Sequence, residues 1–268
     1  MGSINESWHS QLLLVLQNLK ISAELKAYDG YHLVSLNEGT AVLNLMDLKN
    51  TKLPQELISL QEAYLQKNSQ LIHLWEDVWQ TRKEQVLGRI KALVGLNARV
   101  YARKTDVIVL SQLEADTFLD ANHLQSSVGL KFRYGLVWND QLVAVAGFSG
   151  LRKMHNGLDN YRSAELIRFA NLLGTTVIGG FTKLLSHFIK LHQPNDVMSY
   201  ADRDWSLGRT YEKSEFSLVE TTPPALILVD KNTFIRTFPH RLNNEASENQ
   251  YLKVFNSGNL KYILDCEY

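Results

Sequence analysis

The chain has 268 residues, of which 45% are hydrophobic, so it can bury one large core or two of ordinary size. Lysine and arginine together number 28, as do aspartate and glutamate, and this balance excludes a general attraction to nucleic acid or to anionic membranes. No apolar run approaches the roughly 20 residues that span a bilayer, and the first residues lack a signal-peptide pattern. The single cysteine, Cys266, cannot form an internal disulfide, which suits a cytoplasmic protein.

The first part of the chain, residues 1–97, is predicted to form a small α/β domain. Leucines recur at helical spacing over residues 10–25, and Asn37-Glu38-Gly39 separates two apolar stretches in the manner of a hairpin. The elements expected in this part are helix 10–25, strands 31–36 and 40–48, helix 55–68, strand 70–75 and helix 81–93.

The second part, residues 98–268, is predicted to form a larger domain with a C-terminal extension. Asn139-Asp140 separates two apolar stretches and is a strong hairpin signal. Residues after Asp230 can add strands or a lid, and the pattern does not choose between them. The elements expected before that point are strand 107–110, helix 118–124, strands 131–138, 141–148 and 165–170, helix 181–191, strand 196–200, helix 206–213, and strands 216–220 and 225–229.

A glycine pair lies between an apolar strand and a well-defined helical pattern. The segment reads Ile178-Gly179-Gly180-Phe181-Thr182-Lys183 and follows a loop expected over residues 174–180. Free backbone amides at a helix N-terminus and the helix dipole together favour a diphosphate, and glycines allow its close approach. In order and composition this part of the chain, over residues 118–229, resembles the GNAT superfamily of acyl-CoA-dependent transferases. The resemblance implies that the quoted segment holds the diphosphate of acetyl-CoA or another acyl-CoA.

A second motif extends the resemblance. The family's Tyr-Glu-Lys-x-x-Phe-like signature is similar to Tyr211-Glu212-Lys213-Ser214-Glu215-Phe216. The resemblance implies that Tyr211 is a general acid and that the fold is α/β (α+β), a mixed, largely antiparallel sheet flanked by helices. Two residues depart from the family pattern: a threonine, Thr175 or Thr176, replaces the usual Arg or Gln of the loop, and Glu215 replaces the usual Gly before Phe216.

A narrower resemblance covers Arg168-Phe169, Ser199-Tyr200-Ala201-Asp202 and the Gly208-x-x-Tyr211 block. These residues are similar to the C-terminal module of phage and bacterial homing-endonuclease-like proteins and to the phage Mom DNA-modification proteins, which suggests a nucleic-acid substrate. We expect Asp202 and Arg168 to arrange the acceptor, although a structural ion pair is the equal alternative. The residues expected to contact substrate are His123, Glu165, Ser199 and Tyr200.

The N-terminal part is similar to a degenerate nuclease module of the PD-(D/E)xK type. The similarity covers residues 71–79, and the acidic groups available for Mg²⁺ are Glu38 and the Asp47-Leu48-Lys49 tripeptide. The resemblance does not place these residues in the ligand set of a working nuclease, so we expect this module to be inactive. The histidines lack the spacing of a zinc site, so no bound metal is predicted.

Three functions follow from these patterns. The first is transfer of an acyl or related group from a CoA thioester to an amine, which is either a small molecule or a nucleic-acid base. The second is a non-catalytic DNA-binding accessory module derived from a mobile-element endonuclease, with a basic cluster at Arg99, Arg103 and Lys104 as its contact surface. The third is a catalytically dead scaffold. The sequence does not fix an oligomeric state.

Overall fold

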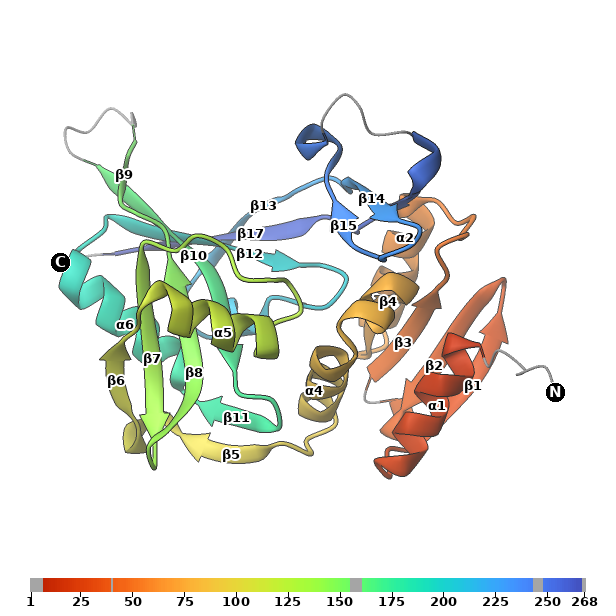
Figure 1. The fold of residues 1–268 in the computed structure, drawn as a ribbon, viewed down its shortest axis with the longest axis horizontal. Coiled ribbons are helices and arrows are strands. Elements are labelled where there is room, and N and C mark those ends of the chain that lie inside the picture. The colour runs from red at the N-terminus through yellow and green to blue at the C-terminus, as the bar shows by residue number, and fades with distance from the viewer. Residues whose placement is uncertain (1–6, 40, 155–160, 243–247, 267–268) are drawn as a thin grey trace. The chain divides into compact units, whose positions relative to one another are not determined.

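The structure is a computed structural model that describes residues 7–39, 41–154, 161–242 and 248–266. The chain divides into two compact units (Figure 1), each built from separate stretches of sequence. Unit 1 comprises residues 1–86, 202–207 and 223–259, and unit 2 comprises residues 87–201, 208–222 and 260–268. The division into domains of residues 1–97 and 98–268 stays a prediction. Within the described residues, no helix is long and apolar enough to cross a membrane.

Unit 1 contains two small sheets. The first has the order β1-β2-β3-β4, antiparallel except for the parallel β3–β4 pair, and the second has the order β15-β14-β16. Residues of both sheets share one core, which includes Val42, Trp75, Val229 and Val254. The helices are α1 (Trp8–Asn18), α2 (Pro54–Leu65) and α3 (Glu76–Thr81), and the strands are β1 (Ala23–Tyr28), β2 (Tyr31–Leu36), β3 (Ala41–Met46), β4 (Gln70–Trp75), β14 (Leu226–Asp230), β15 (Arg236–Thr237) and β16 (Tyr251–Phe255).

Buried charge joins the separate stretches of unit 1. The carboxylate of Asp77, which is 1% exposed, accepts from Arg236 Nε at 2.5 Å and from Nη2 at 3.0 Å. Asp204 accepts from the backbone N–H of Ser257 at 3.0 Å, and burial raises the pKa of Asp204 against the opposing effect of that contact. Hydrogen bonds therefore tie residues 223–259 to the first 86 residues and residues 202–207 to residues 223–259.

Unit 2 is organised around one mixed sheet of order β13-β17-β12-β10-β8-β7-β6, with β9 paired to β10. Strands β10 and β12 are parallel, the pairs β13–β17, β10–β8, β10–β9, β8–β7 and β7–β6 are antiparallel, and a separate parallel pair joins β5 to β11. The helices are α4 (Lys83–Leu93), α5 (Gln112–Asn122), α6 (Gly180–His192) and α7 (Arg209–Glu212), the 3-10 turn η2 spans Ala102–Lys104, and the strands are β5 (Ala98–Tyr101), β6 (Asp106–Val109), β7 (Phe132–Trp138), β8 (Gln141–Phe148), β9 (Arg152–Lys153), β10 (Arg162–Asn171), β11 (Thr175–Ile178), β12 (Asp196–Asp202), β13 (Ser217–Thr221) and β17 (Asn259–Asp265).

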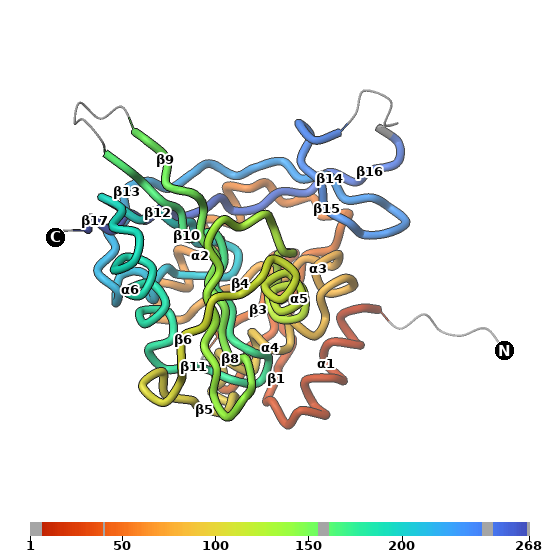
Figure 2. Tube along the Cα trace, turned by 60° about the vertical axis from the view of Figure 1, so that its left-hand side comes forward, coloured from red at the N-terminus to blue at the C-terminus, as the bar shows by residue number. Residues whose placement is uncertain are grey.

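Helices α5 and α6 cover opposite faces of this sheet (Figure 2). The core with α6 includes Ala144 and Ala146 of β8, whereas the core with α5 includes Val145. Because successive strand residues point to opposite faces, the two helices lie on either side of β8. The expected mixed, largely antiparallel sheet flanked by helices is thus confirmed.

Several expected elements are confirmed and others are wrong. Both hairpins form, and strand 70–75 has the expected bounds. The helix expected over residues 10–25 ends at Asn18, because Lys20 has a φ of 58°, and β1 follows. The helix expected over 81–93 is interrupted at Arg82, with a φ of −135°. The strand expected over 225–229 forms as β14, which lies in the three-stranded sheet of unit 1. The position of residue 40, at the start of a predicted strand, lies outside the described residues.

Candidate active site

The candidate site is formed where two parallel strands of unit 2 separate. β10 and β12 are paired from Ser163 opposite Asp196 as far as Leu166 opposite Ser199. β10 then has a bulge between Leu166 and Arg168 and continues its pairing with β8. In open α/β sheets, ligands bind beyond the carboxyl ends of parallel strands where neighbouring chains diverge. The end of the β10–β12 pairing therefore marks a place for a ligand.

Tyr211 lies at this divergence. It is held on the short helix α7, which follows Gly208, a residue with a φ of 75°. The ring of Tyr211 is stacked on Tyr262 of β17, with centroids 4.9 Å apart and an interplanar angle of 12°. The ring meets Phe181, in the first turn of α6, edge to face at 5.4 Å. Its hydroxyl lies 3.0 Å from Oγ of Ser199.

The environment of Tyr211 keeps its hydroxyl protonated near neutral pH. Burial raises the pKa of Tyr211, and the Ser199 hydrogen bond and the charges of Arg89 and Arg168 oppose that shift. Burial also lowers the pKa of Arg168, which Glu165 and Tyr211 act to raise. Tyr211 is consequently a buried phenol with cations nearby, an arrangement that can donate a proton and stabilise the phenolate that remains.

The first turn of α6 forms the other side of the site. Gly179, the N-cap, has a φ of 78°, which favours glycine, and among the described residues no side chain caps the helix. The first turn contains no acidic residue. Backbone amides at this end have no intrahelical acceptor, and the helix dipole adds to their attraction for an anion. The segment from Gly179 to Thr182 therefore has the donors that a diphosphate requires.

Lys183 has a different position from that expected of a diphosphate ligand. Its ammonium group donates to the carbonyl oxygen of Ala102 at 2.8 Å and to that of Thr105. These carbonyls flank the 3-10 turn η2, and β5 is paired with β11 so that Tyr101 is opposite Ile178. Lys183 thus fastens the turn that carries Arg103 and Lys104 to the first turn of α6.

The other predicted contact residues are distributed over several elements. Glu165 forms a long ion pair with Arg152 at 3.9 Å, and Asp202, the last residue of β12, accepts from the backbone N–H of Asp204 at 3.0 Å. His123 follows α5, with Nδ1 3.0 Å from the backbone N of Gln125. Tyr200 is exposed, and it alternates with the buried Ser199 along β12. Ser199 contacts Tyr211, and His123 forms hydrogen bonds with the backbone of Gln125.

The basic cluster is exposed. Arg103 lies over the ring of Tyr101 at 5.2 Å, and Arg99 and Lys104 are exposed nearby in sequence. Tyr101 itself is 47% exposed. The cluster thus combines positive charge with an accessible aromatic ring, which is the composition that binds phosphates and bases.

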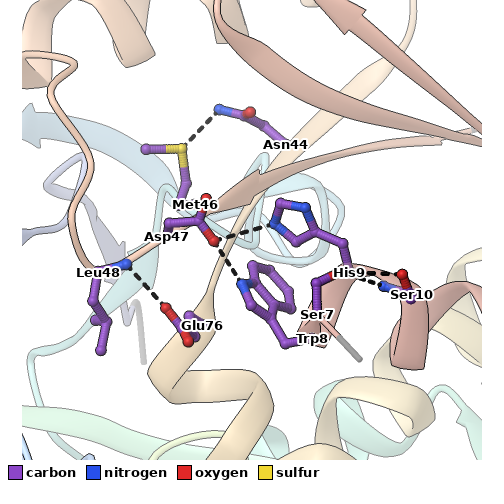
Figure 3. Close-up of polar contacts among 9 residues, drawn as sticks. All are labelled: Ser7, Trp8, His9, Ser10, Asn44, Met46, Asp47, Leu48 and Glu76. Atoms are coloured by element: carbon purple, nitrogen blue, oxygen red, sulfur yellow. Dashed lines mark hydrogen bonds and ion pairs between the residues drawn. The ribbon is translucent and has the colours of Figure 1, made fainter. Parts of the chain in front are cut away.

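Of the two acidic residues in the nuclease resemblance, Asp47 is hydrogen-bonded (Figure 3) and Glu38 is exposed. Asp47 Oδ1 accepts from Trp8 Nε1 at 2.7 Å and lies 3.3 Å from His9 Nε2, and Glu76 accepts from the backbone N–H of Leu48. Lys49 and Asp47 line a cavity of about 170 Å³ in unit 1. Within the described ranges, no three His, Cys, Asp or Glu side chains gather as metal ligands. The nuclease ancestry stays a prediction.

Tyr262 is the functional candidate that the sequence did not reveal. It is fully buried against Tyr211, and its hydroxyl donates to Glu212 at 3.3 Å. Burial, with Glu212 as a further cause, raises the pKa of Tyr262 to about 12. The alternation of Leu260, Tyr262 and Leu264 is a strand signal that could have placed this residue in the sheet.

Comparison with known proteins gives matches among solved structures. No protein-family model matches the chain, and no curated protein matches it significantly. These structures include an IAA acetyltransferase from Bacillus cereus, with 12% identity, a TM-score of 0.37, and coverage of 60% of this chain and 99% of that one.

Two further structures contain a bound cofactor. A Bacillus subtilis acetyltransferase in complex with CoA has 14% identity, a TM-score of 0.38, and coverage of 61% and 100% of the two chains. A GNAT family acetyltransferase from Elizabethkingia anophelis with acetyl-CoA bound has 11% identity, a TM-score of 0.35, and coverage of 61% and 99%. Similarity at this level assigns neither an activity nor a ligand to the present chain.

Proposed function

We propose that unit 2 is a GNAT-like transferase that moves an acyl group from a CoA thioester to an amine. The observation that carries the proposal is the position of Tyr211. Its hydroxyl reaches Ser199 at the end of the β10–β12 pairing, and its ring touches Phe181 in the first turn of α6. A proton donor and an anion-binding helix N-terminus are thereby adjacent, as transfer from a thioester bearing a diphosphate requires.

The residues present fit such a cofactor. The uncapped amides from Gly179 to Thr182 supply donors for a diphosphate, and the two glycine positions keep side chains away from them. Bound acyl-CoA supplies an activated thioester carbonyl. The chain itself contributes an oriented phenol at Tyr211 and the positive charge of Arg168, which can orient the acceptor or stabilise developing negative charge.

The acceptor is an amine of a small molecule or of a nucleic-acid base. The exposed pair of Arg103 and Tyr101 favours a partner that carries phosphate, and this observation also supports the second candidate function, a non-catalytic DNA-binding module. Charge reversal at Arg103 and Lys104 distinguishes the DNA-binding module from a transferase that acts on small amines. A DNA-binding module loses salt-sensitive DNA binding in that variant, whereas a transferase for small amines shows no DNA binding to lose. A cytoplasmic location is part of the same proposal.

Replacement of Tyr211 by Phe tests the catalytic role. We expect acetyl-CoA to bind with unchanged affinity and acyl transfer to a panel of primary amines to fall by about 100-fold, the usual contribution of a general acid. Release of free CoA thiol is the readout. Equal turnover in the variant would remove Tyr211 from the reaction, since the substitution deletes only the hydroxyl.

A further inference from the structure

The hydroxyl of Ser199 has two acceptors and one proton. Ser199 is 1% exposed, and its Oγ lies 2.8 Å from the carbonyl oxygen of Leu166 and 3.0 Å from the hydroxyl of Tyr211. A serine hydroxyl can donate only one hydrogen bond at a time. The Leu166 carbonyl can only accept, so when Ser199 donates to it, the phenol of Tyr211 must donate to Ser199.

We infer that Ser199 is a positioning residue that switches its single proton between Leu166 and Tyr211 as Tyr211 gives up and regains its own proton. The inference rests on the proposed function and deepens it. While Tyr211 is protonated, the order of donation is Tyr211 to Ser199 to the Leu166 carbonyl, and each group is satisfied. Once Tyr211 is a phenolate, the Ser199 hydroxyl rotates and donates to the phenolate oxygen. This charge-assisted hydrogen bond is stronger than the neutral bond between Tyr211 and Ser199 that it replaces.

The proton balance of the transfer is then complete. The amine nitrogen forms a bond to the thioester carbonyl carbon, the carbon–sulfur bond breaks, and the electron pair leaves with sulfur. The Tyr211 proton passes to that sulfur and gives a free thiol, while Ser199 turns toward the phenolate. The amine loses its extra proton to water, and water returns a proton to Tyr211, so no further reagent is consumed.

The surroundings hold the phenol ring in place, so the serine proton is the part that moves. Tyr262 stacks on one face of the ring, and Phe181 and Phe216 lie edge-on at 5.4 and 5.5 Å. The ionisable groups that act on Tyr211 are Arg89 and Arg168, with Tyr262 beside it. Glu212 is hydrogen-bonded to the hydroxyl of Tyr262, and both residues are unchanged in the variants below.

The experiment compares Ser199→Ala with Ser199→Cys in the full chain. Carbon-13 tyrosine labelling gives a resonance for Tyr211, identified by its loss in Tyr211→Phe, whose titration midpoint reports ionisation of the phenol. The phenolate of Tyr211 loses a hydrogen bond in Ser199→Ala, so the phenol should ionise less readily. We expect its acid dissociation constant to fall about tenfold, which moves the titration midpoint to higher pH. Ser199→Cys keeps the packing and a weak donor, so it should give an intermediate value.

The same variants have a kinetic readout. Turnover should fall by about tenfold in Ser199→Ala, with KM for acetyl-CoA unchanged, and by less in Ser199→Cys. A midpoint in Ser199→Ala equal to that of the unaltered protein would overturn the inference, because a merely structural serine leaves ionisation of Tyr211 unaffected. Failure of the proposed function is a separate result: the protein would not bind acetyl-CoA, whatever the titration of Tyr211.

Discussion

In unit 1, the buried carboxylate of Asp77 is matched by the guanidinium of Arg236 from a distant part of the sequence. In unit 2, the buried hydroxyl of Ser199 is shared between a backbone carbonyl and the phenol of Tyr211, so its proton has two possible positions. The first arrangement has one state and joins chain segments. The second has two states and lies beside a helix N-terminus that no described side chain caps. A buried polar group is therefore a candidate for a catalytic role when its hydrogen bonds can rearrange, as those of Ser199 can.

The largest expected effect concerns the ion pair between Arg236 and Asp77 in unit 1. Arg236→Met leaves Asp77 buried without its counter-ion, and we expect a loss of about 3 to 5 kcal/mol in the free energy of unfolding, measured with urea. Lys261→Met, which breaks the more exposed pair with Glu220 in unit 2, is the control and should cost at most about 1 kcal/mol. Equal losses in the two variants would mean that the buried pair is not a structural tie.

A pH effect of smaller size is expected at His73 of unit 1. Its ring is fully buried, Nε2 contacts the carbonyl of Leu57, and burial lowers the pKa of His73 to about 4. The unfolded chain binds a proton near pH 6.5 and the folded one does not, so stability present above pH 6.5 is lost as the pH falls toward 4. The full loss is about 3 kcal/mol.

His73→Asn provides the comparison. This variant cannot take up the proton, so the difference between its unfolding free energies at pH 7 and pH 4 should be smaller than that of the unaltered protein by about 3 kcal/mol. A pH dependence equal in the two proteins would show that His73 is protonated in the folded state, which would contradict its burial as a neutral ring.

The smallest of these effects is expected at Gly208, which lies against Tyr262 in unit 2. Gly208 and Gly174 have φ values of 75° and 76°, but a Cβ on Gly208 would lie 1.9 Å from the hydroxyl of Tyr262, whereas nothing lies within 4 Å of one on Gly174. The backbone strain of alanine is similar at the two positions, so the clash with Tyr262 decides the difference. Gly208→Ala should lower the free energy of unfolding, measured by thermal unfolding, by about 2 kcal/mol more than Gly174→Ala does. Equal costs would show that Tyr262 is not tightly held against α7.

Sequence patterns predicted much of the fold of unit 2, because its hairpin and its helix α6 depend on local signals. Asn139-Asp140 has positive φ at both residues, as its turn requires, and α6 has a regular apolar face. Unit 1 was harder to predict, since β14 and β16 complete a core whose other strands are about 150 to 220 residues earlier. No local pattern states which sheet a strand will join.

Local sequence patterns also predicted only part of the candidate site. The family signature suggested Tyr211 and the Gly179-Gly180 pair, and the structure brings both next to Phe181. The tether of Lys183 to two carbonyl oxygens and the stacking of Tyr262 depend on residues about 80 and 50 positions away, respectively. Spacing along the sequence carries no information on such pairs, whereas the alternation around Tyr262 could have indicated its strand.

The most direct test of the central claim is calorimetric titration with acetyl-CoA of the unaltered protein, Thr182→Glu and Thr182→Gln. Thr182 is exposed in the first turn of α6, where an acidic residue suits the helix dipole, so Thr182→Glu should fold. Substitution of Gly180 is less suitable, because a Cβ there would lie 2.9 Å from Val177.

We expect the unaltered protein and Thr182→Gln to bind acetyl-CoA and Thr182→Glu to bind at least about tenfold more weakly, because only the carboxylate repels the diphosphate. Absence of binding by the unaltered protein, or equal binding by Thr182→Glu, would contradict the assignment of this helix N-terminus as the acyl-CoA site.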